Sequence, residues 1–142
     1  MLEQISDSIP WHHAHPILVN FTAGLIPTSV MSDLLGRVSG KGSLSSAAWW
    51  MLLFATLLTP ATALTGWFWK QTLPSAALPA DLIQIHQWLG SALAILFVIM
   101  TLWRARMYFR EEIPSIVYLI FAALAVGLLA IQGNLGGTMV FG

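Results

Sequence analysis

Four histidines are the side chains of this sequence best suited to chemistry. His12, His13 and His15 lie close together near the N-terminus, and His86 stands by itself in the second half of the chain. The sequence contains no cysteine, which excludes disulfides, iron–sulfur ligation and covalent haem attachment. Any cofactor must therefore be held without a covalent bond, by histidine, methionine or carboxylate side chains.

His15 and His86 each lie near the beginning of a long apolar segment. At about 100° per residue, His15 shares a helix face with Asp33, and His86 shares one with Gly90. If both segments run in the same direction, the two imidazoles lie at similar depth and can face each other. Two neutral imidazoles on separate helices suit the axial positions of a b-type haem. Gly90, one turn after His86, would leave room for the flat macrocycle.

The cluster of His12, His13 and His15 has an alternative interpretation. Three imidazoles within four residues could bind a divalent metal such as copper or zinc, although no fourth ligand is evident nearby. Asp33 lies three residues before Gly36, where the first apolar segment ends. We therefore expect Asp33 to be a carboxylate at a helix end that reaches water.

The composition identifies the environment that these residues share. The chain has 142 residues, of which 57% are hydrophobic and 8% are charged, whereas an ordinary soluble domain has about 25% charged residues. Six basic and six acidic residues give no net charge, and the basic residues are scattered, so nucleic acid is not an expected partner. The expected environment is a lipid bilayer.

Four segments are long and apolar enough to cross a bilayer, which takes roughly 20 residues. They cover about residues 15–36, 47–69, 82–103 and 113–132. Short connections between them predict a single all-α domain, an up-down-up-down four-helix bundle. Residues 1–14 are predicted to form an interfacial segment, the charged run 104–112 a loop, and residues 133–142 a glycine-rich tail that follows the fourth helix.

The basic residues predict the orientation of this bundle. All but one of the six lie in the first and third connections: Arg37, Lys41, Arg104, Arg106 and Arg110. Short loops rich in Lys and Arg stay in the cytoplasm. Both termini are therefore predicted on the outer side of the membrane.

Several short motifs resemble a known family. They are His15-Pro16-Ile17-Leu18-Val19, Ser32-Asp33-Leu34-Leu35, Leu64-Thr65-Gly66, His86, and Gly136-Gly137-Thr138-Met139-Val140-Phe141. In this order, over nearly the whole chain, they resemble the bacterial family known as domain of unknown function 2231. The resemblance implies a four-span inner-membrane protein, and it favours haem because some members occur with redox partners.

Two positions depart from the pattern of that family. Members often have a further histidine where this chain has Asn20, and another after the closing motif, where this chain ends at Gly142. Only His15 and His86 can therefore be carried over as ligands.

The leading hypothesis is a small electron-transfer subunit with haem b between the first and third spans. It would pass electrons between a quinone or another outer-face donor and a larger membrane or redox complex. The alternative is a structural or assembly subunit without a cofactor. The sequence contains no nucleophile–base pair or phosphate-binding loop that would indicate an enzyme, and no internal repeat is evident.

Overall fold

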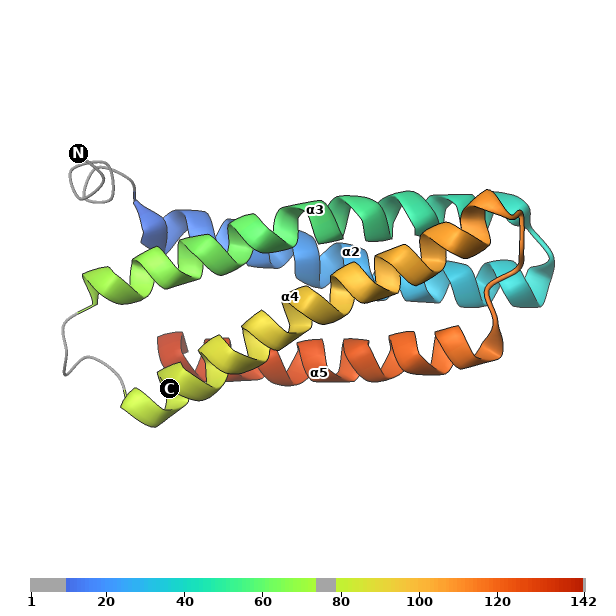
Figure 1. Cartoon of the computed structure of the whole chain (residues 1–142). Coiled ribbons are helices and arrows are strands. Elements are labelled where there is room, and N and C mark those ends of the chain that lie inside the picture. Colours follow the sequence, from blue (N-terminus) through green and yellow to red (C-terminus); the bar gives the residue numbers. More distant parts are fainter. Residues whose placement is uncertain (1–9, 74–78, 142) are drawn as a thin grey trace.

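A computed structural model describes residues 10–73 and 79–141 of the chain. Its helices are α2 (Trp11–Ser39), α3 (Gly42–Thr72), α4 (Ala80–Phe109) and α5 (Ile116–Phe141). Figure 1 shows them running in alternating directions, with the start of α2 and the end of α5 at the same end of the bundle. This confirms the predicted all-α four-helix fold. Most of the predicted interfacial segment, residues 1–9, lies outside the described residues.

Each helix is long and apolar enough to cross a membrane, so the protein is a multi-pass membrane protein. Its outer surface agrees, because large apolar side chains such as Phe54, Leu102 and Val117 are each more than half exposed on it. Such a surface would be unfavourable in water and is expected in contact with lipid. The side of the membrane on which the termini lie remains a prediction.

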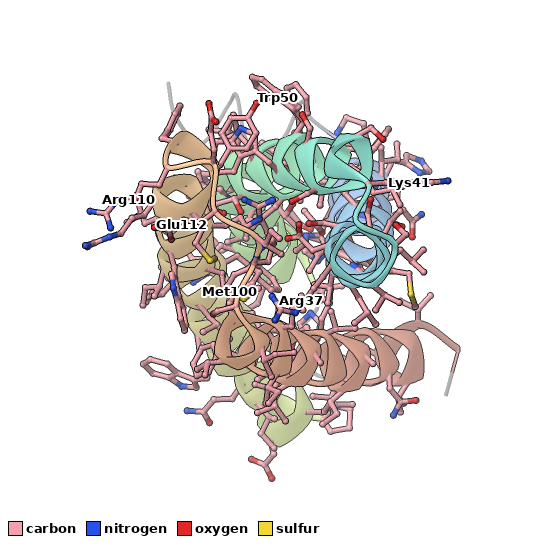
Figure 2. All side chains as sticks on the ribbon, turned by 90° about the vertical axis from the view of Figure 1, so that its right-hand side faces the viewer. Arg37, Lys41, Trp50, Met100, Arg110 and Glu112 are labelled. Atoms are coloured by element: carbon pink, nitrogen blue, oxygen red, sulfur yellow. The ribbon has the colours of Figure 1, made fainter. Side chains whose placement is uncertain are left out.

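The helices are arranged so that neighbours in the chain are neighbours in space. α2 and α4 each pack against both α3 and α5, and the view along the bundle in Figure 2 shows the four helices around a common centre. The core between them is formed mainly by apolar side chains, among them Ile26, Phe97, Met100 and Ala122. α2 and α4 therefore face each other diagonally across this core, and these are the helices that carry His15 and His86.

Two predicted helix ends are wrong. Arg104 and Arg106 belong to α4 rather than to a loop, because the guanidinium of Arg104 finds a carboxylate partner inside the bundle. Residues 133–141, predicted as a tail, continue α5 through their glycines. Glycine weakens an isolated helix by about 1 kcal/mol per residue, but in this helix Gly136 lies against the neighbouring helix α4.

Candidate functional site

His15 is held by the neighbouring helix α3. Its Nδ1 lies 2.9 Å from the carbonyl oxygen of Thr62 and 3.3 Å from Oγ1 of Thr65. Because a carbonyl oxygen can only accept, Nδ1 carries the hydrogen and donates it. The neutral ring then has its lone pair on Nε2. The contact depends on Gly66, where a Cβ atom would lie 2.7 Å from Cε1 of the ring.

His86 packs against α5 at the same end of the bundle. A Cβ atom at Gly136 would lie 3.2 Å from Cε1 of this ring, and the backbone of Gln132 lies close to the imidazole. Its Nδ1 is buried and has no hydrogen-bond partner among the residues that the structure describes. Buried polar atoms normally have a hydrogen-bond partner, so this nitrogen is available to bind one.

His15 and His86 lie near the starts of α2 and α4, which run in the same direction, so both rings lie at the same end of the bundle. His15 comes from α2 and His86 from α4, the two helices that oppose each other diagonally. Both rings are half-buried, and each lies against a glycine of a different neighbouring helix.

Gly90 lies in the interior, as its position one turn after His86 requires, but the space beside it is filled. A Cβ atom there would lie 2.8 Å from Nε2 of Gln132, whereas room for a flat macrocycle was expected. The same Nε2 donates to the backbone oxygen of His86 at 2.9 Å, and Oε1 of Gln132 is buried without a partner in the described part of the chain. The sequence analysis missed Gln132, and the available signal was an amide inside an apolar segment.

His12 and His13 do not join this site. Both are exposed, and their ring centroids lie 4.0 Å apart, whereas His15 turns towards α3. In residues 10–73 and 79–141, no three histidine, cysteine or acidic side chains form a group that could hold a metal ion. The alternative copper or zinc site therefore has no three-ligand geometry in this part of the chain.

A second polar cluster lies at the opposite end of the bundle. Asp33 is fully buried, and its carboxylate accepts hydrogen bonds from Nε and Nη2 of Arg104 at 2.8 and 2.9 Å. Nη2 also donates to the backbone oxygen of Ser45 at 2.8 Å. The expectation that Asp33 reaches water is thus wrong, because a charge from α4 compensates it inside the protein. The cluster ties α2, α3 and α4 together.

Two polar atoms in this second cluster have no partner among the described residues. They are Nη1 of Arg104 and the hydroxyl oxygen of Tyr118, which are both buried. Tyr118 comes from α5 and lies close enough to Asp33 and Arg104 to interact with their charges. All four helices therefore contribute a polar side chain to this end of the bundle.

Comparison with known proteins supports one assignment. A family model described as predicted membrane protein (DUF2231) matches residues 11–142, and the chain therefore belongs to this family. No curated protein and no solved structure matches the chain.

Proposed function

We propose that this member of the DUF2231 family binds a b-type haem between α2 and α4, with His15 and His86 as axial ligands, and transfers electrons within the membrane. The observation that carries the proposal is the hydrogen bond from His15 Nδ1 to the carbonyl of Thr62. Histidines that bind metals commonly donate their second ring N–H to a carbonyl or carboxylate, which fixes the tautomer and the orientation of the ring. The Thr62 carbonyl fixes the tautomer and the ring orientation of His15 in the same way.

His86 supports the same proposal from the opposite helix. Its imidazole lies at the same end of the bundle as that of His15, and its Nδ1 is buried without a partner among the described residues. Because α2 and α4 oppose each other diagonally, His15 and His86 could hold a haem iron between these helices. Bound in this position, haem would supply one-electron transfer, while the surrounding apolar side chains would exclude water and influence its potential.

The position of the Gln132 side chain sets a condition on haem binding between α2 and α4. Its amide fills the space beside Gly90 that a macrocycle would need. The amide is the far end of a flexible side chain, held there by one hydrogen bond to the His86 backbone. The fit therefore requires this amide to rotate away, without any movement of the helix backbone.

The proposed partners follow from the small size of the protein. Four membrane helices leave little mass outside the bilayer, so electron transfer needs a donor and an acceptor supplied by others. A quinone in the bilayer is a suitable donor, and a larger membrane or redox complex is a suitable acceptor. We place this assembly in the bacterial inner membrane.

The second candidate function is a structural or assembly subunit without a cofactor. It is favoured by one observation, namely that Gln132 already fills the space beside Gly90. In this case the buried hydrogen bonds of His15 and Gln132 would serve only to join neighbouring helices.

Absorption spectra distinguish the two functions. Protein purified from cells supplied with haem is expected to give a reducible b-type spectrum, which His15→Ala and His86→Ala each abolish. His12→Ala and His13→Ala are the matched controls, because both side chains are exposed, and they should retain the spectrum. Well-folded protein without a Soret band would reject haem binding and favour the structural function. A metal lost to chelators and dependent on His12 and His13 would instead support the copper or zinc alternative.

A further inference from the structure

We infer that His15 and His86 are held by two copies of one arrangement, in which a backbone carbonyl and the glycine four residues later position an imidazole from the preceding helix. In the first copy, Thr62 supplies the carbonyl and Gly66 the glycine for His15. In the second, Gln132 and Gly136 occupy the corresponding positions for His86.

The two copies agree in sequence spacing and in the edge of the ring that faces the glycine. His15 and Thr62 are 47 residues apart, and His86 and Gln132 are 46 residues apart. In both copies the ring atom nearest to the glycine is Cε1, and Nδ1 follows it in distance. The helix pair α4–α5 therefore repeats the local geometry of the pair α2–α3.

The glycine has a direct physical role. A helical carbonyl already accepts the N–H four residues later, but its second lone pair is free for another donor. A side chain at that later position lies over the carbonyl on the same face of the helix. A Cβ atom at Gly66 would also lie 3.1 Å from Nδ1 of His15. Glycine thus allows an imidazole N–H to reach a carbonyl inside a helix.

The second copy of this arrangement explains the unpaired Nδ1 of His86. This atom is buried next to the Gln132 backbone, and an unpaired buried N–H is costly in an apolar environment. A small turn of the ring towards the Gln132 carbonyl supplies the same bond that His15 makes. Both neutral imidazoles then carry hydrogen on Nδ1 and a lone pair on Nε2.

The role of these two Nε2 atoms in binding iron rests on the proposed function, whereas the tautomers do not require haem. Gly66 and Gly136 are thus positioning residues, which act through His15 and His86.

The test is ¹⁵N NMR of the histidine side chains in the haem-free, full-length protein in detergent. His15 and His86 are expected in a single Nδ1–H form, while the exposed His12 and His13 serve as internal references. Gly66→Ala should abolish the single tautomer of His15 and leave His86 unchanged, and Gly136→Ala should do the reverse. Alanine favours a helix more than glycine does, so both variants should retain their helix content.

Gly133→Ala and Gly137→Ala are the matched controls on α5, because a Cβ atom at either position meets no atom within 4 Å. Both should leave both tautomers unchanged. The inference is overturned if His86 carries its hydrogen on Nε2, or if Gly136→Ala leaves its signal unchanged. Nδ1–H tautomers in a protein that never binds haem would reject the proposed function alone. A haem spectrum with unaltered tautomers in both glycine variants would reject this inference alone.

Discussion

At the scale of single residues, the pair of Asp33 and Arg104 is the clearest target for mutation, because each side chain is only 1% exposed. Arg104→Met is expected to lower the free energy of unfolding by about 3–5 kcal/mol, since it leaves a buried carboxylate without its partner. The double variant Asp33→Leu/Arg104→Met should lose less than this. Chemical denaturation in mixed micelles measures both values.

Arg110→Met is the control for this prediction. Arg110 lies 3.9 Å from Glu112, and both side chains are more than half exposed, so a change within about 0.5 kcal/mol is expected. Figure 2, which views the bundle from its loop end, shows Arg110 projecting away from the helices. Equal losses in the Arg104 and Arg110 variants would contradict the buried role of Arg104.

The hydroxyl of Tyr118 gives a second prediction at this scale. It is buried without a partner, while the ring packs edge-on against Trp103 at 5.6 Å. Tyr118→Phe keeps this ring contact and removes the unpaired polar group. The free energy of unfolding should stay the same or rise by up to about 1 kcal/mol. A fall in the free energy of unfolding would instead reveal a hydrogen-bond partner of this hydroxyl, such as a buried water.

At the scale of helices, α5 gives the next prediction, because its last turns contain glycines that were expected to end it. If residues 133–141 are helical, Gly133→Ala should raise the free energy of unfolding by about 0.5–1 kcal/mol, since no atom obstructs the new Cβ. Gly40→Ala should lower the free energy of unfolding by about 1 kcal/mol. Gly40 follows α2 with a φ of +70°, and a residue with a Cβ atom is unfavourable in this left-handed conformation. A frayed tail would make Gly133→Ala neutral.

The sequence predicted the helices better than their ends. Apolar length alone identified four spans, because a bilayer sets a minimum length for a spanning helix. The end of α4 was missed because charge was expected to end the span, whereas Arg104 is buried by pairing with Asp33, 71 residues earlier in the chain. Local composition contains no information on such a partner.

The candidate site shows the same limit. His15 and His86 were found by residue type and by their place at the start of a span. Their supports were not found, because Thr62 offers only its backbone and Gly66 only the absence of a side chain. The repeated geometry also escapes a sequence comparison, since its two copies share little more than a histidine and a glycine.

At the scale of the whole molecule, the remaining question is which end of the bundle faces the cytoplasm. The structure places the start of α2 and the end of α5 at one end of the bundle, and the α2–α3 and α4–α5 connections at the opposite end. The structure also lowers the number of exposed basic residues on which the predicted orientation rests, because Arg104 is buried in an ion pair. The loop end keeps four other basic residues: Arg37, Lys41, Arg106 and Arg110.

The orientation can be tested with a reporter fused after Gly142. The loop end has four basic residues besides Arg104, whereas the other end has Lys70. This distribution still favours a cytoplasmic loop end. An alkaline phosphatase fusion, which is active only after export, should therefore be active, and a fusion placed after Lys41 should be inactive. The reverse pattern would place His15 and His86 near the cytoplasmic surface. Any electron donor to that site would then have to approach from the cytoplasm or from the inner leaflet of the membrane.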